Sequence, residues 1–395
     1  MWLTLGVLGS KCRLMFGSPL RLVAPVLAVS VGLVAACSAD QGQAFDVAVA
    51  ATAEALQAEA PTVEPTVVEP TATPEPVPTV STIYDGVYSI EVDGSGDYAT
   101  IEEALEQVTN GAELRLGAGT FQITTTLVID KDIVLTGAGQ NSTTIRNTSR
   151  DLIITVAEAE VTITDLTTDG GFGVNVNESE IDIHRVTFQR SSLDGLTISN
   201  SVATVTDSIS KDNAVGGFNW AGETSGMASN NTAQNNQGHG FYLSGGAAPQ
   251  LTGNTSNANA GAGFVWTDQT SGVVSNNTAQ SNQYDGFSMS GSALLELTGN
   301  TSKDNGRSGF AWWEQASGVA SNNTSQNNQI DGFEIGWSAA LELTGNTSKG
   351  NAGAGFAWYD EASGVASNNT AQNNQYKAFD NQSSGDLELS NNNEE

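Results

Sequence analysis

The sequence predicts an all-β solenoid, in which the chain winds repeatedly around one axis and each coil stacks on the one before it. The prediction rests on three residue columns that recur every 23 positions through the C-terminal half. Self-similarity at a fixed period of this length is typical of repeat proteins whose units stack in one dimension. The columns are the dipeptide Asn-Thr at Asn231, Asn254, Asn277, Asn300, Asn323, Asn346 and Asn369; a phenylalanine at Phe218, Phe241, Phe264, Phe287, Phe310, Phe333, Phe356 and Phe379; and a second asparagine at Asn213, Asn236, Asn259, Asn282, Asn305, Asn328, Asn351 and Asn374.

Residues 1–36 have the features of a secretory signal peptide rather than of a folded element. Lys11, Arg13 and Arg21 supply a positively charged region, and the apolar run 22–36 follows them. The run is too short for a comfortable membrane span but suits the apolar part of a signal peptide.

Cys37 comes directly after the small residues that end this apolar run. The arrangement resembles the lipobox of bacterial lipoproteins, which implies that Cys37 becomes the lipidated first residue of the mature chain. Translation could start at Met1 or at Met15, and Met15 gives the more typical signal length. Cys12 would be removed with the signal, so the mature chain would have neither a disulfide nor a cysteine-based metal site.

Residues 37–82 are expected to form a disordered linker behind the lipid anchor. Prolines punctuate a Thr-, Val- and Glu-rich tract at Pro61, Pro65, Pro70, Pro74, Pro76 and Pro78. Such a tract cannot build a core and favours the extended polyproline conformation, so residues 61–80 could reach roughly 60 Å. We interpret the segment as a stalk.

The folded region, residues 83–395, opens with Asp-Gly-Ser-Gly-Asp-Tyr-Ala-Thr-Ile at positions 93–101. Thr100 and Glu103 fit a capping box, and the apolar residues after them predict a short helix. Short strands are expected next, at 113–116, 127–129 and 133–135.

This opening resembles the N-terminal entry of right-handed parallel β-helix proteins of the pectate lyase and pectin methylesterase superfamily. The later Asn-Thr, Asn and Gly-Phe coils also resemble the repeats of that superfamily. The resemblance covers about residues 83–390. It implies a single-stranded right-handed parallel β-helix of roughly 12 or 13 coils, with regular coils at about 208–385, and a short helix that caps its N-terminal end. It implies little about activity, because this fold hosts many functions.

Alternation with period two predicts which side chains of the Phe-containing strand face inward. The Phe column and an apolar column two positions later are expected to point into the core, and the mixed column between them to point out. Stacked asparagines are expected to hydrogen-bond from coil to coil. The inward apolar column is Val176, Ile198, Trp220, Leu243, Trp266, Met289, Trp312, Ile335 and Trp358.

Two aromatic residues, Trp313 and Tyr359, follow this apolar column and are expected to face outward. They lie beside Glu314 and Asp360, with Trp337 on the coil between them. Exposed aromatics with carboxylates suit a carbohydrate-binding surface, although scattered surface aromatics are also normal. The threonines that follow each Asn231-type asparagine could form an ice-binding ladder, but structural packing is the favoured interpretation.

Enzymes on this fold usually act on acidic polysaccharides, so a lyase-type site in the early coils is an alternative. The weak candidates are His184, Arg185 and Asp194, with Asp182 and Arg190 nearby. The tripeptide centred on His239 resembles a polygalacturonase element, but no accompanying Asp-Asp pair or Arg-x-Lys element is found. Asp194, Asp285 and Asp331 each precede a turn glycine, which is ordinary turn chemistry.

Acidic residues outnumber basic ones by 44 to 14, and the net charge is −30. Nucleic acid and anionic lipid head groups both need a positive field, so neither is an expected partner. The charge either attracts cations or keeps the protein soluble, and the second role is the commoner.

Together these features predict a lipid-anchored, monomeric protein on the bacterial cell surface, in contact with the membrane only through its anchor. It would bind polysaccharide or other envelope or extracellular material without catalysis. The alternatives are a polysaccharide lyase, hydrolase or epimerase and a structural or adhesive spacer. No cofactor or metal is expected, although calcium is possible. A catalytic site would need a coil that departs from the repeat and brings several polar side chains together. The irregular coils at 150–210 are where such a departure could lie.

Overall fold

The computed structural model describes residues 6–7, 10–11 and 86–395. Strands β1 (Gly6–Val7) and β2 (Ser10–Lys11) form a small antiparallel pair. Cys37, the apolar run 22–36 and the linker lie outside the described residues, so the signal peptide, lipidation site and stalk stay predictions. No helix among the described residues is both long enough and apolar enough to cross a membrane.

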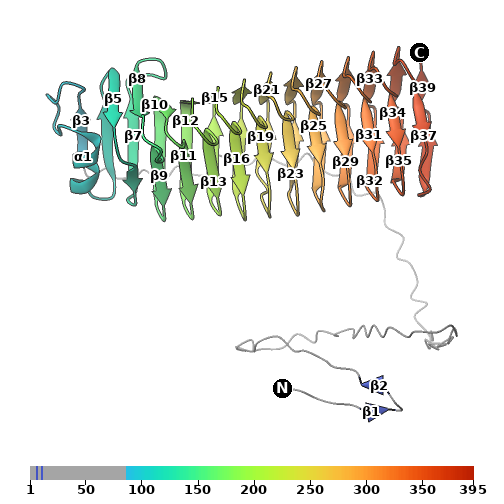
Figure 1. The fold of residues 1–395 in the computed structure, drawn as a ribbon, viewed down its shortest axis with the longest axis horizontal. Coiled ribbons are helices and arrows are strands. Elements are labelled where there is room, and N and C mark those ends of the chain that lie inside the picture. Colours follow the sequence, from blue (N-terminus) through green and yellow to red (C-terminus); the bar gives the residue numbers. More distant parts are fainter. Residues whose placement is uncertain (1–5, 8–9, 12–85) are drawn as a thin grey trace, which may run out of the picture. The chain divides into compact units, whose positions relative to one another are not determined.

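Residues 86–395 form a parallel β-solenoid of about 13 coils, as the sequence predicts (Figure 1). Every strand pair in this part of the chain is parallel, and successive coils are in register. One face is a 12-stranded sheet that carries the Phe column, and we call it the Phe sheet. Its strands are β6 (Leu127–Ile129), β9 (Ile154–Ala157), β11 (Val174–Asn177), β13 (Leu196–Ser199), β16 (Phe218–Ala221), β19 (Phe241–Leu243), β22 (Phe264–Trp266), β25 (Phe287–Met289), β28 (Phe310–Trp312), β31 (Phe333–Ile335), β34 (Phe356–Trp358) and β37 (Phe379–Asn381).

The chain then turns into a second stack of strands. Its members are β3 (Gly86–Ile90), β4 (Ala112–Leu116), β7 (Ile133–Gly137), β10 (Glu160–Gly170), β12 (Glu180–Gln189), β14 (Val202–Thr206), β17 (Ser225–Ser229), β20 (Gln250–Thr252), β23 (Ser271–Ser275), β26 (Leu294–Thr298), β29 (Ser317–Ser321), β32 (Ala340–Thr344), β35 (Ser363–Ser367) and β38 (Leu387–Ser390).

A third stack carries the threonine column and completes each coil. The long strands β10 and β12 run through both the second and the third stack. The other members are β5 (Gly119–Ile123), β8 (Thr143–Asn147), β15 (Ile209–Lys211), β18 (Thr232–Gln234), β21 (Thr255–Asn257), β24 (Thr278–Gln280), β27 (Thr301–Lys303), β30 (Thr324–Gln326), β33 (Thr347–Lys349), β36 (Thr370–Gln372) and β39 (Asn393–Glu394).

The predicted inward columns form the core. Neighbouring Phe rings from Phe218 to Phe379 stack with centroids 4.6–5.1 Å apart. The four tryptophans of the apolar column, from Trp220 to Trp358, are at most 1% exposed. The core interpretation of these tryptophans is therefore confirmed.

Both asparagine columns are buried and hydrogen-bonded from coil to coil. Asn300 donates its Nδ2 to Asn323 Oδ1 (2.9 Å) and to the carbonyl oxygen of Val274 (2.8 Å), and its Oδ1 accepts from Asn277. The second column repeats the arrangement, as from Asn282 to Asn305 (3.0 Å). The side-chain amides thus satisfy backbone groups at coil corners that would otherwise be buried without partners.

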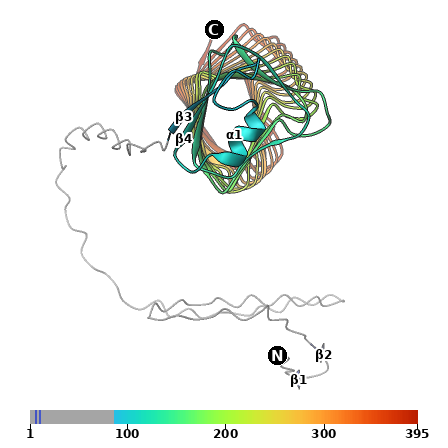
Figure 2. The same cartoon turned by 90° about the vertical axis from the view of Figure 1, so that its left-hand side faces the viewer.

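The helix α1 (Ile101–Gln107) begins after Thr100, whose Oγ1 accepts a hydrogen bond from the Glu103 backbone N–H (3.1 Å). Ile101 and Leu105 on its inner side belong to the hydrophobic core. Seen end-on, α1 lies across the outline of the coils at the end where β3 and β4 lie (Figure 2). Its role as a cap stays a prediction.

Candidate functional site

The turn that follows each strand of the Phe sheet from β9 to β34 carries one residue in the left-handed backbone conformation. Gly, Asn and Asp tolerate this conformation better than other residues, which explains most of the column. Its members, with φ from 49° to 70°, are Glu158, Glu178, Asn200, Gly222, Gly245, Asp268, Gly291, Glu314, Trp337 and Asp360.

Three hollows lie side by side along this column of turns. Their volumes are about 520, 510 and 390 Å³. The first and second share Glu223 in their linings, and the second and third share Gly291 and Ser292. They therefore form one continuous groove that crosses coil after coil, which we call the turn groove. From Glu158 to Trp337 it extends roughly 38 Å, at about 4.8 Å per coil.

The charged residues that line the turn groove are all acidic. No lysine or arginine takes part in the lining of the three hollows. The carboxylates are those of Asp132, Glu158, Glu160, Glu178, Glu180, Glu223, Asp268 and Glu314.

Three carboxylates of the turn column accept hydrogen bonds from the backbone of the preceding coil. Asp268 accepts from the backbone N–H of Gly245 (3.1 Å), and Glu314 accepts from that of Gly291 (2.8 Å). Asp360 accepts in the same way from Trp337 (3.2 Å). Each of these hydrogen bonds uses one of the two carboxylate oxygens.

Trp337 departs from the rest of the turn column. It is 56% exposed, lines the third hollow, and has φ 55°. A bulky residue in the left-handed region costs of order 1–3 kcal/mol and often marks a functional position. An exposed indole at the end of a groove is a surface on which a flat or ring-shaped ligand can stack.

Trp313 and Tyr359 lie beside the groove and are half-buried rather than fully exposed. The Trp313 ring lies so close to Gly336 that a Cβ there would be 2.6 Å from the Trp313 Cζ3 atom. Tyr359 donates its hydroxyl to Asp331 Oδ2 (3.2 Å), and burial with the nearby charge of Asp331 raises the pKa of Tyr359. Of the five predicted binding residues, Trp337 and Glu314 thus line the groove, Asp360 accepts a hydrogen bond from the preceding coil, and Trp313 and Tyr359 flank the groove.

A polar cluster lies on the outward side of the Phe sheet, near these aromatics. Glu334, on β31, is only 9% exposed, and burial raises its pKa to about 7. The Glu334 Oε2 atom accepts a hydrogen bond from the hydroxyl group of Ser308 (2.5 Å). The backbone N–H of Ser308 in turn donates to Asp285 Oδ1 (2.9 Å). Asp331 is 4% exposed, and burial raises its pKa as well.

The sequence did not single out Glu334. Its column lies on the outward side of the Phe sheet, but neighbouring side chains cover Glu334 there. Val265, Ala311 and Ala357 of the same column are also buried. One cause is visible at Trp313, whose ring lies over the neighbouring coil. The available signal was a carboxylate whose two column neighbours are the alanines Ala311 and Ala357, in a regular coil rather than in 150–210.

Of the early candidates, the structure brings His184 and Arg185 into contact, and Asp194 has partners of its own. Arg185 forms a two-bond ion pair with Asp165, at 2.6 Å for both bonds. His184 contacts Thr206 through Nδ1 (2.7 Å) and Arg185 through Nε2. Asp194 accepts from the backbone N–H of Gly216 (2.6 Å) and from Asn219 Nδ2 (3.0 Å).

Arg190 and Arg146 pair with the same buried carboxylate, Asp169. His239 is half-buried, accepts from the backbone N–H of Ala262 (3.0 Å) and stacks on Tyr242. Burial lowers the pKa of His239. These contacts give the arginines and His239 structural roles, and the lyase hypothesis for the early coils stays a prediction.

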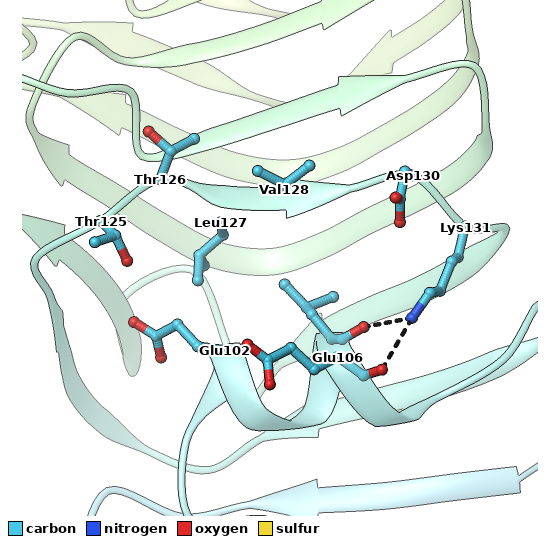
Figure 3. A pocket seen from close by; sticks show the side chains of 9 residues that line it. Glu102, Glu106, Thr125, Thr126, Leu127, Val128, Asp130 and Lys131 are labelled. Carbon is cyan, nitrogen blue, oxygen red and sulfur yellow. Dashed lines mark hydrogen bonds between the residues drawn. The ribbon is translucent and has the colours of Figure 1, made fainter.

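A further hollow of about 340 Å³ lies between α1 and β6 (Figure 3). Lys131 lies at its edge and donates its Nζ to the carbonyl oxygens of Leu105 (2.7 Å) and Glu106 (3.3 Å). A cation at these carbonyls stabilises the C-terminal end of the helix, so the lysine already has a structural role. Among the described residues, no three His, Cys, Asp or Glu side chains are arranged to hold a metal ion.

The fold and its stacked coils define a right-handed β-helix protein. A family model for the right-handed β-helix region matches residues 151–284 and again 261–393, which together make up more than half of the chain. The chain therefore belongs to the right-handed β-helix family. None of the curated proteins matches it in sequence.

Two solved structures share the architecture. The catalytic domain of a GH87 alpha-1,3-glucanase in complex with tetrasaccharides is 15% identical, with a TM-score of 0.55, and the match covers 82% of this chain and 70% of that chain. The A-module of the mannuronan C-5 epimerase AlgE6 from Azotobacter vinelandii is 17% identical, with a TM-score of 0.51, and the match covers 74% and 92%. At these identities the likeness shows the common fold.

Proposed function

We propose that this protein binds a linear polysaccharide along the turn groove. The observation that carries the proposal is a continuous groove across successive coils with the strained, exposed Trp337 at one end. A linear polymer can repeat its contacts coil after coil, and an indole can stack on a sugar ring while carboxylates and amides accept its hydroxyl groups.

The names of the two fold relatives support this choice. One is an epimerase named for mannuronan, and the other is a glucanase in complex with tetrasaccharides. Both are polysaccharide-related proteins built on stacked coils, so a sugar polymer is a reasonable partner for this groove.

The substitution Trp337→Gly tests the proposal. Glycine occupies the same turn position at Gly245 and Gly291, so the variant should fold and lose about 1 kcal/mol of strain. We expect it to be more stable than the parent and to bind polysaccharide at least tenfold more weakly on a glycan array and in calorimetry. Tyr376→Ala removes a 62% exposed aromatic outside the groove and should leave binding unchanged. Equal binding by both variants would reject the groove as the site.

The second candidate function is hydrolysis of a glycosidic bond, and the buried cluster favours it. Two carboxyl groups flanking a bond are the usual requirement, with one held protonated near neutral pH. Glu334, with its pKa of about 7, would be the general acid, and Asp331 the second carboxylate.

Release of reducing ends from a polysaccharide panel tests this candidate. Glu334→Gln and Asp331→Asn should each reduce turnover more than 100-fold if it holds, a typical range for general acid–base groups. Glu342→Gln, an exposed acid on β32, is the control. If the parent protein binds polysaccharide without any turnover, hydrolysis is rejected and the non-catalytic binding function remains.

We also propose that Cys37 carries a lipid that anchors the protein to the outer side of a bacterial membrane, with residues 38–82 as the stalk. The partner would then be envelope or extracellular polysaccharide. Metabolic labelling with a fatty acid in a bacterial host should mark the parent and not Cys37→Ala, and the variant should leave the membrane fraction. An unlabelled parent protein would refute the anchor.

A further inference from the structure

We propose that the polymer held in the turn groove is an amino-sugar polysaccharide that carries protonated amines. The inference rests on the proposed function and adds the chemical class of the ligand. It follows from the sign, the pairing and the spacing of the charges along the groove.

The first hollow brings like charges together on neighbouring strands. Glu160 and Glu180 are direct partners in the parallel pairing of β10 with β12, and their side chains are exposed. Glu158 and Glu178 occupy equivalent turn positions of the same two coils. Like charges directly opposite each other on adjacent strands are destabilising. A cation that lies between them removes this repulsion.

No cation within residues 86–395 does so. The ion pairs in this part of the chain join other acids, namely Glu113, Asp165, Asp169, Asp207 and Asp380. None of the five glutamates of the first hollow is among them. Their charge is therefore available to a ligand.

The acids of the later coils recur with a two-coil period. Asp268, Glu314 and Asp360 follow one another at intervals of 46 residues, with Gly291 and Trp337 in the coils between them. Two coils rise roughly 9.6 Å, so Asp268 and Glu314 present negative charge two coils apart in the later part of the groove, and Asp360 continues this spacing beyond it. A polymer with repeated positive groups can meet this charge at successive coils, which a single small cation cannot do.

The same charges exclude other polymers. A polyuronate would be repelled along the whole groove, because the lining contains no basic residue. An uncharged glycan would leave the glutamates of the first hollow unneutralised. A basic peptide would match the charge but lacks the ring that Trp337 is placed to stack on.

The decisive comparison uses two ligands of equal length, one with free, charged amines and the other with acetylated, neutral amines. Glucosamine oligomers and their N-acetylated counterparts of equal length are titrated by calorimetry in mildly acidic buffer, where the free amines are protonated. We expect the glucosamine oligomer to bind at least tenfold more tightly at low salt, and this advantage to shrink at high salt because screening weakens exposed charge pairs. Equal affinity of the two oligomers would overturn the inference.

Variants separate the groove from the general acidity of the protein. The double substitution Glu160→Gln and Glu180→Gln should reduce glucosamine-oligomer affinity about tenfold and leave the N-acetylated oligomer little changed. The matched control, Glu296→Gln with Glu342→Gln, removes the same charge from exposed positions on β26 and β32 and should have no comparable effect. Equal losses in the two double variants would overturn the inference.

Two further ligands distinguish the remaining outcomes. If oligolysine binds as tightly as the glucosamine oligomer and loses affinity with the same groove variant, the site recognises charge rather than sugar, and the inference fails. If N-acetylated or neutral oligomers bind best in a Trp337-dependent way, the inference fails and the proposed function stands. If no sugar polymer binds, the proposed function itself fails.

Discussion

The early coils and the regular coils of this solenoid are held together in different ways. In the early coils, ion pairs cross from coil to coil, as between Arg146, Arg190 and the buried Asp169. In the regular coils, buried asparagine amides link each coil to the next. Amide ladders need identical residues in register, which only coils of equal length provide. Where coil length varies between 20 and 28 residues, long and flexible charged side chains make the connection instead.

The largest effect is expected from breaking an amide ladder. Asn300→Leu removes the acceptor for Asn277 and the donor to Val274, and so leaves buried backbone and side-chain groups unpaired. At about 1–3 kcal/mol per unsatisfied group, the free energy of unfolding should fall by about 3–5 kcal/mol in urea denaturation. Gln326→Ala, in an outward column of the next coil, should cost less than about 0.5 kcal/mol. Equal effects would mean that the ladder contributes little.

The regular coils also contain buried charges that oppose folding, and Glu334 has the most strongly raised pKa among them. Its folded pKa of about 7 lies above the ordinary value of 4.5, so the protein should lose stability as pH rises from about 4.5 to 7 and then level off. Glu334→Gln should remove most of this slope and add about 2–3 kcal/mol above pH 7. Chemical denaturation across this pH range measures both, and an unchanged slope would show that another group is responsible.

The early coils should respond to pH in the opposite direction. Burial opposes ionisation of Asp169, but hydrogen bonds from Arg190 and Arg146 outweigh it and keep the pKa of Asp169 below its ordinary value. Its stabilisation is therefore present above about pH 4 and is lost as pH falls through the lowered pKa. Asp169→Asn should cost about 2 kcal/mol at neutral pH, less than a fully buried pair because both guanidinium groups are partly exposed. The difference from the parent should vanish in acid, and a pH-independent difference would contradict this account.

The smallest effect is expected at Arg185. Its pair with Asp165 is largely exposed, so Arg185→Gln should lower the free energy of unfolding by less than about 1 kcal/mol, and added salt should reduce the difference. The same variant tests the lyase hypothesis for the early coils. Unchanged binding and turnover would leave Arg185 with a structural role, whereas turnover in the parent that Arg185→Gln abolishes would move the active site there.

Much of the fold could be predicted from the sequence because equal spacing places like residues in register. The Phe column, the tryptophan core and both asparagine ladders follow directly from the 23-residue repeat. The turn groove and the Glu334 cluster could not be predicted in this way. They depend on how outward side chains lean across coils, as Trp313 does over Gly336, and the period contains no information about that direction.

The same limit explains the candidates in the early coils. The grouping of His184, Arg185 and Asp194 was based on closeness along the chain, whereas the partner of Arg185 is Asp165, one coil earlier. The irregular lengths of these coils hide which residues stack. Among the predicted binding residues, Trp337 and Glu314 line the groove because they follow the regular part of the repeat.

In the later coils of the turn column, acidic residues alternate with other residues. This alternation determines how many coils an insertion must add to keep the order of side chains in the groove. Duplicating one coil would place two acids or two glycines in adjacent layers, whereas duplicating a pair of coils extends the groove and keeps its order of side chains. Insertions or deletions of 46 residues should therefore yield shorter and longer forms that recognise the same polymer, with affinity that grows with the number of sugar units each form can span.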